Sequence, residues 1–357
     1  MRKLLAVVAC SGLVAALSAC KDSSGDADAF VDSDSGEGPA VAAEPKLEND
    51  PAVLDAALFC TPFEHPDKPP VLLVHGTFTN GGQQYNWTYL PLLQARGFDV
   101  CHVSYPDLGM GDLQNSAEYI VYALRKIRAE SGRKVAMIGH SQGAILPRWA
   151  LKWWPSAREA VEDFVMHAGP NHGGNPVYLV YEVFAALGAA QDPATPLMPE
   201  SLFQMTTGSN FVAALNADDG TPGEISYTSL YTLFDELVQP VVPTPTAALD
   251  WRIENPKVAN ILLEDVCPLR IVDHVTIGLT DRLAFDLSLD AIGNPGPANV
   301  ERAGGAAALC GAVPLLPDQI LDPNLIPDLF TAPPPGPFDP HLATEEPPLR
   351  PYAAPQP

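Results

Sequence analysis

The stretch Val135-Ala-Met-Ile-Gly-His-Ser-Gln-Gly-Ala144 decides the fold of this chain. Apolar and small residues that suit a buried strand run into Gly139-His140-Ser141-Gln142-Gly143, and an apolar, helix-like stretch follows. When a G-x-S-x-G motif joins a strand to a helix, its serine lies on a sharp, strained turn. Only small residues two before and two after the serine let the backbone pass so closely. The motif therefore predicts a serine hydroxyl exposed above the carboxyl edge of a sheet.

Strands and helices are expected to alternate on both sides of this stretch. Short apolar or β-branched runs predict strands, and runs with a 3.6-residue apolar period predict helices. The expected strands are residues 71–74, 98–105, 135–138, 161–166, 225–234 and 258–263, with 269–272 as a further strand or extended piece. The expected helices are residues 53–59, 87–96, 115–130 and 142–154. Such alternation implies an α/β fold with a mostly parallel central sheet and helices on both faces.

A serine nucleophile needs a histidine base, and the base needs a carboxylate that fixes its tautomer. In the hydrolases that carry this turn, the order along the chain is serine, acid, histidine. The histidines after Ser141 are His167, His172, His274 and His341. The first two follow the serine too closely to leave room for an acid-bearing strand, and the last lies in a proline-rich tail. His274 is therefore the candidate base.

The acid is expected at the end of a strand. Asp235 comes directly after Tyr231-Thr-Leu-Phe234 and is the candidate, with Asp265 and Asp273 as alternatives. Asp273 is adjacent to His274 in sequence, and an extended chain points two such side chains apart.

A second loop is expected at the same edge of the sheet. His75-Gly76-Thr77 comes directly after the expected strand 71–74. In α/β-hydrolases a His-Gly pair in this position begins the loop that supplies an oxyanion donor.

Residues 177–198 differ in character from the chain before them. Val177 to Ala190 is apolar over most of a helical circumference and is followed by the loose Gln191-Asp-Pro-Ala-Thr-Pro196. One interpretation is a lid or an acyl-binding wall beside the active-site loops, and the other is a buried core helix.

The N-terminus predicts export. Met1-Arg-Lys3 and the apolar residues 4–17 form the pattern of a secretory signal peptide. Leu17-Ser-Ala-Cys20 resembles the lipobox of bacterial lipoproteins, in which the cysteine becomes the lipidated first residue of the mature chain. The alternative is an ordinary secretory cleavage site. We expect the chain to be held at the outer membrane or cell surface through Cys20, or else secreted.

The domain organisation follows from composition. It comprises a signal peptide (residues 1–20), a flexible acidic tether (21–48), one catalytic domain (49–325) and a proline-rich tail (326–357). The tail is expected to form no regular ladder and to wrap the surface as polyproline II or hang free.

Charge and cysteine usage exclude some classes of function. The 20 Lys and Arg against 43 Asp and Glu give a net charge of -23, which argues against a nucleic-acid partner. No cysteine or histidine spacing is typical of a zinc site. With Cys10 removed and Cys20 lipidated, an even set remains, which suggests two disulfides with three pairings open. These cysteines are Cys60, Cys101, Cys267 and Cys310.

Three further segments resemble the Candida antarctica lipase B-like family of α/β-hydrolase lipases and its bacterial members. They are Tyr231-Thr-Leu-Phe-Asp-Glu-Leu-Val-Gln-Pro240, Ile271-Val-Asp-His274 and Gln204-Met-Thr-Thr-Gly-Ser209. The likeness covers roughly Cys60 to Cys310, and the first segment is far more specific than G-x-S-x-G. The resemblance implies the α/β-hydrolase fold in a single domain, in which residues 177–190 would be either the lid helix or the buried core helix described above.

The resemblance also implies a role for each site residue. Ser141 would be the nucleophile, Asp235 the acid and His274 the base, with Thr77 and Gln142 as oxyanion donors. The Thr77 hydroxyl could add a third donor to the two backbone N–H groups.

The same resemblance implies the disulfides Cys60–Cys101 and Cys267–Cys310, each closing about forty residues. This chain departs from the family pattern at His140, where the yeast enzyme has a tryptophan that shapes the alcohol pocket. The resemblance therefore does not carry a substrate preference to this chain.

Together these features predict a serine hydrolase that cleaves carboxylic esters through an acyl-enzyme, with triacylglycerol as the expected substrate and no metal or organic cofactor. A short-chain esterase or polyester depolymerase would use the same machinery. A non-catalytic lipid-binding surface lipoprotein is the alternative outside the enzymes. The expected partners are a lipid or ester substrate and, through lipidated Cys20, a membrane.

Overall fold

The computed structural model describes residues 44–175, 197–249, 254–313, 316 and 338–354. All of these belong to one compact unit, Glu44–Pro357. Residues 177–196, the segment expected to be a lid, an acyl-binding wall or a buried helix, lie outside the described residues. So does Cys20, with the expected signal peptide and most of the tether.

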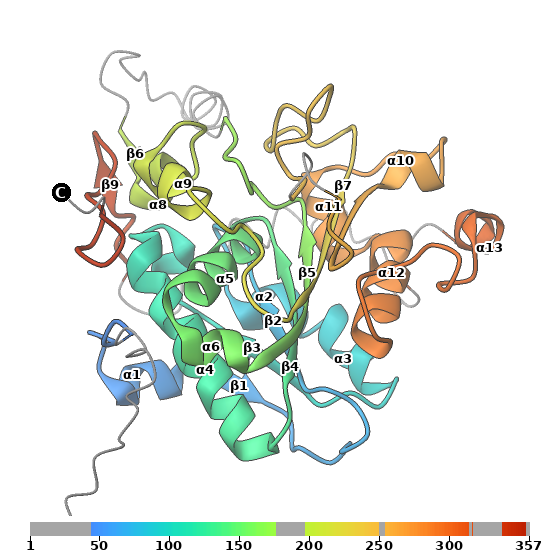
Figure 1. Cartoon of the computed structure of the whole chain (residues 1–357), viewed down its shortest axis with the longest axis horizontal. Coiled ribbons are helices and arrows are strands. Elements are labelled where there is room, and N and C mark those ends of the chain that lie inside the picture. The colour runs from blue at the N-terminus through green and yellow to red at the C-terminus, as the bar shows by residue number, and fades with distance from the viewer. Residues whose placement is uncertain (1–43, 176–196, 250–253, 314–315, 317–337, 355–357) are drawn as a thin grey trace, which may run out of the picture. The chain divides into compact units, whose positions relative to one another are not determined.

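A seven-stranded sheet forms the centre of the fold (Figure 1). Its strands are β1 (Leu58–Cys60), β2 (Val71–Val74), β3 (Val100–Val103), β4 (Val135–His140), β5 (Val161–His167), β7 (Ser226–Tyr231) and β8 (Val258–Leu262). Their order is β1-β3-β2-β4-β5-β7-β8, and only the pair of β1 with β3 is antiparallel. Every residue of β2 and β4 is buried, as in parallel strands covered on both faces. The predicted α/β class with a mostly parallel sheet is confirmed.

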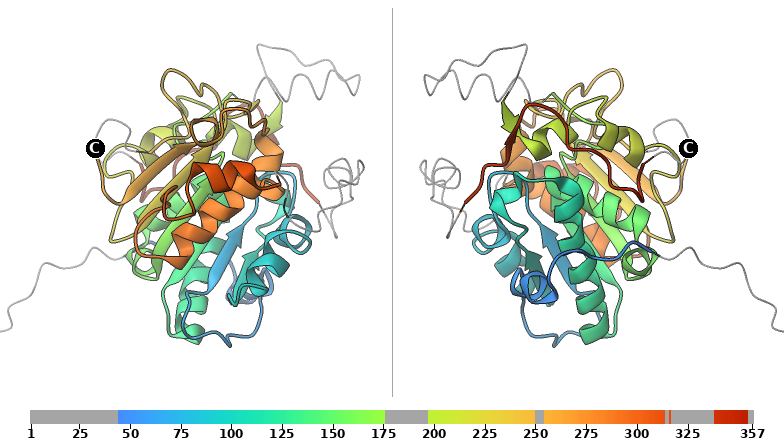
Figure 2. Two further views of the ribbon diagram at one scale, coloured as in Figure 1. Left: turned by 90° about the vertical axis from the view of Figure 1, so that its right-hand side faces the viewer. Right: turned by 90° about the vertical axis from the view of Figure 1, so that its left-hand side faces the viewer.

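Helices cover both faces of this sheet. Those before residue 160 are α1 (Pro51–Ala56), α2 (Gly81–Tyr85), α3 (Tyr89–Gln94), the 3₁₀ turn η1 (Asp107–Gly109), α4 (Leu113–Ser131), α5 (Gln142–Trp153) and α6 (Pro155–Glu159). Later elements are α8 (Glu200–Gln204), α9 (Asn210–Leu215), α10 (Leu263–Val266), α11 (His274–Leu279), α12 (Arg282–Gly293) and α13 (Ala306–Gly311), with the short strands β6 (Met198–Pro199) and β9 (Leu342–Ala343). Helices α4, α5 and α6 lie on one face, and α3 and α12 lie on the other (Figures 1 and 2). A separate apolar cluster fills each face.

Local signals set the bounds of the longest helix, α4. The Asp112 side chain accepts a hydrogen bond from the Gln114 N–H and caps the first turn. Gly132 ends the helix with φ 72°, a conformation that glycine adopts without steric cost. The apolar side of α4 packs against α5, which carries the chain away from Ser141.

Two segments differ from the sequence prediction. Residues 58 and 59 are predicted to end a helix, but together with Cys60 they form edge strand β1, because β3 offers an antiparallel partner. Residues 269–272 are not a strand: they form an irregular loop between α10 and α11. Arg270 turns inward from this loop to an ion pair with Asp281, whereas Leu269 and Ile271 face outward. The side-chain partner of Arg270 therefore overrides the strand propensity of its neighbours.

The described part of the C-terminal segment, residues 338–354, packs against the domain. The prediction that this segment forms no ladder is wrong, because β9 pairs antiparallel with β6. Arg350 contacts the buried Glu118 carboxylate of α4, and Tyr352 accepts a hydrogen bond from the Trp149 indole at 3.1 Å. Figure 2 shows the segment, in red, on the same side of the molecule as α4 and α5.

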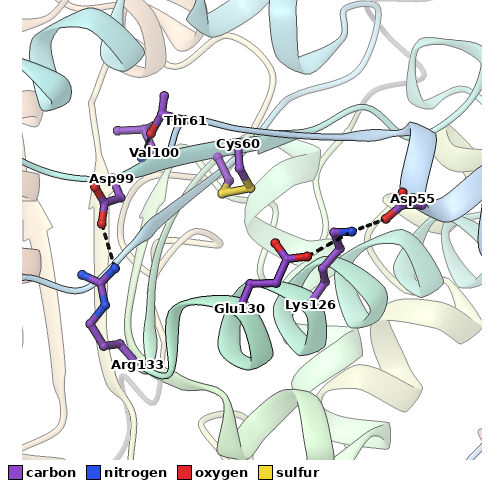
Figure 3. Close-up of a disulfide and its surroundings, with 9 residues drawn as sticks. Asp55, Cys60, Thr61, Asp99, Val100, Lys126, Glu130 and Arg133 are labelled. Atoms are coloured by element: carbon purple, nitrogen blue, oxygen red, sulfur yellow. Dashed lines mark hydrogen bonds and ion pairs between the residues drawn. A yellow bond between two sulfur atoms is a disulfide. The ribbon is translucent and has the colours of Figure 1, made fainter. Parts of the chain in front are cut away.

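A disulfide joins the edge strand β1 to its neighbour β3. Cys60 of β1 and Cys101 of β3 lie opposite each other in the ladder and are bonded (Figure 3). Nearby, the Val100 N–H donates to the Thr61 hydroxyl at 2.9 Å, and Arg133 pairs with Asp99 at 2.7 Å. This edge lies at the β1 end of the strand order, and β2 separates it from the strand that leads into Ser141.

Within the described ranges, no helix combines the length and apolar character that crossing a bilayer requires.

Candidate active site

Ser141 lies on the sharp turn between β4 and α5. Its backbone has φ 56° and ψ -119°, in a region that side-chain-bearing residues rarely adopt. A Cβ on Gly139 would lie 1.9 Å from the Gly143 carbonyl oxygen, and one on Gly143 would lie 2.1 Å from the Val74 oxygen. Glycine at both positions is therefore what lets the chain turn here. The half-buried serine follows directly after the carboxyl end of the central strand β4.

The serine, histidine and aspartate singled out from the sequence lie in contact. Nδ1 of His274 lies 3.0 Å from each carboxylate oxygen of Asp235, and Nε2 lies 2.9 Å from Oγ of Ser141. A carboxylate can only accept, so Nδ1 carries the imidazole proton and Nε2 accepts from the serine hydroxyl. This is the geometry of a nucleophile with a general base that an acid orients.

Asp235 is buried and bound from several sides. Its Oδ1 accepts the backbone N–H groups of Leu237 at 2.9 Å and Val238 at 2.7 Å. Burial opposes ionisation of this carboxyl, but the charge of His274 and these hydrogen bonds outweigh it and lower its pKa. Asp235 is thus an anion beside the imidazole. It lies four residues beyond the end of β7, not directly after a strand as predicted.

The pKa of His274 is raised above its usual value. Burial of the imidazole opposes protonation, but the charge and hydrogen bond of Asp235, with smaller contributions from Glu236 and Asp273, outweigh it. Glu236 also accepts the backbone N–H of His274 at 3.0 Å. The site therefore favours the protonated form of the His274 imidazole.

Several contacts anchor the loop that delivers His274. A disulfide joins Cys267 to Cys310 at the start of the loop. Arg270 pairs with Asp281, the N-cap of α12, through Nε at 2.8 Å, and both side chains are buried. Asp273 caps α11 by accepting the Val275 and Thr276 N–H groups. His274 is therefore the first residue of a capped helix, whereas the sequence predicts it just after residues 269–272, a strand or extended piece.

Thr77 and Gln142 lie together beside the serine. Gln142 is the first residue of α5, so its N–H is one of the amides that have no partner within the helix. Thr77 lies in the loop after β2, and its hydroxyl donates to Oε1 of Gln142 at 2.6 Å. The hydroxyl expected as a third oxyanion donor is thus bound to the Gln142 side chain in this structure.

The alternative residues lie in other environments. The Asp273 side chain is occupied with the helix cap, and Asp265 lies within α10. Nε2 of His167 is bonded to Ser288 at 2.8 Å, and Nε2 of His341 to Asp107 at 2.8 Å. The backbone N–H of His172 donates to Thr246 at 3.0 Å.

Three further residues contact this site, and the sequence assigned no partner to any of them. Glu236 binds the backbone N–H of His274, as described above, and Nε2 of His140 lies 2.7 Å from the carbonyl oxygen of His274. Gln84 of α2 contacts His140 at 3.2 Å. Glu236 is adjacent to the predicted acid, and His140 to the predicted nucleophile, but no spacing rule assigns either a partner. Among the residues that the structure describes, no three His, Cys, Asp or Glu side chains form a group that could hold a metal ion.

The chain is similar to fungal lipases along most of its length. Lipase B of Pseudozyma antarctica is 30% identical over an alignment of 310 residues that covers 80% of this chain and 86% of that protein. The crystal structure of Aspergillus fumigatus lipase B matches with a TM-score of 0.71 and 27% identity, covering 89% of this chain and 76% of that one. No family model matches the chain. With this identity and coverage, the chain belongs to the lipase B family of α/β-hydrolases and is a carboxylic ester hydrolase.

Proposed function

We propose that this protein is a serine lipase that hydrolyses acylglycerols through an acyl-enzyme. Ser141 is the nucleophile, His274 the general base and Asp235 the acid that orients it. The observation that supports this assignment most strongly is the pair of contacts at His274: 2.9 Å from Nε2 to Ser141 and 3.0 Å from Nδ1 to Asp235.

In acylation, Oγ of Ser141 attacks the ester carbonyl carbon while its proton passes to Nε2 of His274. The carbonyl oxygen becomes an oxyanion, which the backbone N–H groups of Thr77 and Gln142 stabilise. When the intermediate collapses, the carbon–oxygen bond to the alcohol breaks. His274 then gives its proton to the leaving alkoxide, so that an alcohol departs and the acyl group stays on Ser141.

In deacylation, water repeats the attack. His274 takes a proton from the water as it adds to the acyl-enzyme carbonyl, and it returns that proton to Oγ of Ser141 as the ester bond breaks. A carboxylic acid leaves and the free enzyme is restored. Asp235 remains ionised throughout and stabilises the imidazolium. No metal or organic cofactor takes part.

Exposed apolar side chains beside the site favour a lipid substrate over a small soluble ester. Leu269 is 97% exposed and Ile271 78% exposed on the loop before His274. Leu233 and Phe234, just before Asp235, are also exposed. The two loops are joined where the Thr232 hydroxyl contacts the Val272 carbonyl oxygen at 2.8 Å. Apolar surface of this kind is typical of contact with lipid or protein.

The same proposal covers export and anchoring. The sequence pattern at residues 1–20 is that of a lipoprotein signal, and two disulfides fit an oxidising compartment. We assign residues 21–48 to a tether, 49–325 to the catalytic domain and 326–357 to the tail. Residues 44–48 would be the end of the tether that contacts the domain, since the Glu48 N–H donates to Glu118 at 2.7 Å. In a bacterial host, labelled palmitate should appear on the protein and disappear in Cys20→Ser; an unlabelled wild type would contradict the anchor.

The enzymatic proposal is tested with an ester panel. Wild-type protein should hydrolyse p-nitrophenyl esters from acetate to palmitate and emulsified triacylglycerols. Ser141→Ala should lose all activity above background. Activity confined to acetate and butyrate would overturn the lipase assignment in favour of a short-chain esterase.

A second comparison isolates the apolar surface. The variant Leu269→Ser/Ile271→Ser should lose about tenfold in rate on emulsified triacylglycerol and keep its rate on soluble p-nitrophenyl acetate. Equal rates of variant and wild type on the emulsion would contradict a lipid-facing role for this loop.

A further inference from the structure

His140 directly precedes the candidate nucleophile in the chain and contacts the backbone of the candidate base. It is the last residue of β4, and it is buried. Its ring packs directly on the backbone of α11, because a Cβ on Gly278 would lie 2.2 Å from the His140 Cδ2. The imidazoles of His140 and His274 have their centroids 5.2 Å apart. His140 thus touches the helix that begins with the candidate base.

Three hydrogen bonds form a chain from Gly76 through Gln84 and His140 to the backbone of His274. The Gly76 N–H lies 2.9 Å from Oε1 of Gln84, and Nε2 of Gln84 lies 3.2 Å from Nδ1 of His140. Nε2 of His140 lies 2.7 Å from the carbonyl oxygen of His274. We call this chain of contacts the Gln84–His140 relay.

The two ends of the relay fix the direction of every bond. The Gly76 N–H can only donate, so the Gln84 oxygen faces it and the Gln84 amide nitrogen donates to His140. The His274 carbonyl can only accept, so Nε2 of His140 carries the proton and Nδ1 is the acceptor. All four members are therefore satisfied with one tautomer of His140 and one orientation of the Gln84 amide.

His140 is held in the neutral form that this pattern requires. Burial, with a smaller contribution from the neighbouring His274, lowers the pKa of His140 to about 3. At any pH where His274 can act as a base, His140 remains uncharged. It therefore holds the His274 backbone without adding a second positive charge beside the imidazolium.

We propose that His140 and Gln84 are positioning residues for ester hydrolysis, an inference that rests on the proposed roles of Ser141 and His274. One end of the relay holds Gly76, directly before the oxyanion donor Thr77. The other end holds the backbone of the base itself. The relay thereby fixes the spacing between the group that takes the proton and the loop that stabilises the oxyanion. Small displacements between such groups slow a reaction strongly, because the reacting atoms must meet at near-contact distance.

The test is a double-mutant cycle in the full-length protein with p-nitrophenyl butyrate. His140→Phe keeps a ring but removes both bonds, and Gln84→Met keeps length but removes both amide bonds. Each should lower kcat about tenfold with KM within about twofold of wild type. Since the two residues act in one chain, the double variant should lose no more than about tenfold. His140→Gln, which can still donate to the His274 carbonyl, should regain most of the loss.

Gln83→Met is the matched control. Gln83 lies beside Gln84 on α2, but its side chain bonds to Asn80 at 2.7 Å and takes no part in the relay. It should keep wild-type kcat. The melting temperature of each variant shows how much of a loss in activity comes from unfolding. If His140→Phe does not fold, the single variants Gln84→Met and His140→Gln still test the relay.

The outcomes separate this inference from the proposed function. Fluorophosphonate should label wild-type protein at Ser141 and label His140→Phe and Gln84→Met about tenfold more slowly. Wild-type labelling with equal rates in the variants would overturn the relay alone, as would losses that multiply in the double variant. A wild type that is not labelled would overturn the nucleophile, and the relay with it.

Discussion

Glu236 accepts the backbone N–H of His274 at 3.0 Å, while its neighbour Asp235 accepts the imidazole Nδ1–H of the same residue at 3.0 Å. Two consecutive carboxylates therefore bind the backbone and the ring of the candidate base. Asp235 is buried, whereas Glu236 is exposed to solvent. Both charges contribute to raising the pKa of His274.

The pH dependence of hydrolysis should respond to Glu236. His274 must be neutral to accept a proton, so the acid limb of kcat/KM follows its pKa. Glu236→Gln keeps an acceptor for the His274 N–H but removes the charge, which lowers that pKa. The acid limb should therefore move to lower pH. The shift should shrink in about 1 M salt, where the Debye length is about 3 Å. An acid limb that stays in place, or moves to higher pH, would contradict the contribution of Glu236.

Stability should depend on the titration of Asp163 in β5. Burial, reinforced by the charge of Glu162, raises the pKa of Asp163 to about 7. The folded state then holds a proton that the unfolded state releases near pH 4, so rising pH destabilises the fold between about pH 4 and 7. Asp163→Asn should remove this contribution. The melting temperature of Asp163→Asn minus that of wild type should increase with pH between about pH 4 and 7 and stay constant above pH 7. A difference that is independent of pH would show that Asp163 has an ordinary pKa.

The two disulfides should differ in their effect on catalysis. Their sequence separations are 41 and 43 residues, so the chain-entropy model assigns each about 3 to 4 kcal/mol of unfolding free energy. Replacing either cysteine pair by serine should lower chemical-denaturation stability by a similar amount. Only loss of Cys267–Cys310 should also lower kcat, since this bond anchors the loop before His274. If loss of Cys60–Cys101 lowers kcat equally, the anchoring role is wrong.

The C-terminal segment should contribute to stability through Arg350. Its guanidinium contacts the Glu118 carboxylate, whose side chain is fully buried. Arg350→Ala leaves that carboxylate without its charged partner and should cost about 3 kcal/mol in urea unfolding. Adding Glu118→Gln removes the buried charge and should recover part of the loss. An unchanged unfolding midpoint in Arg350→Ala would mean that the segment contributes little.

The parts of the fold that depend on local pattern could be predicted from the sequence. Strand β2 and the first four residues of β4 are continuous apolar runs, because both faces of these central parallel strands are buried. The turn at Ser141 could be recognised because close backbone contacts require its two flanking glycines. The order of serine, acid and histidine then left few candidates for the base, and the three candidate side chains lie in contact.

The parts that depend on distant partners could not be predicted. Leu269, Ile271 and Val272 are apolar strand formers, yet the loop that contains them is shaped by the ion pair of Arg270 with Asp281. Strand β1 exists because β3 lies beside it, and β9 because β6 does. The sequence shows that His140 departs from the family pattern next to the nucleophile, but it does not give the partners of His140, since Gln84 and His274 are 56 and 134 residues away. Periodicity and turn chemistry describe local preferences, and they do not record such contacts.

Reaction of the full-length protein with a fluorophosphonate, followed by peptide mass mapping, tests the proposed nucleophile most directly. We expect one phosphonylated site, Ser141, in wild-type protein, no labelling of Ser141→Ala, and strongly slowed labelling of His274→Ala. A label on any other residue, or labelling that persists in Ser141→Ala, would contradict the assignment.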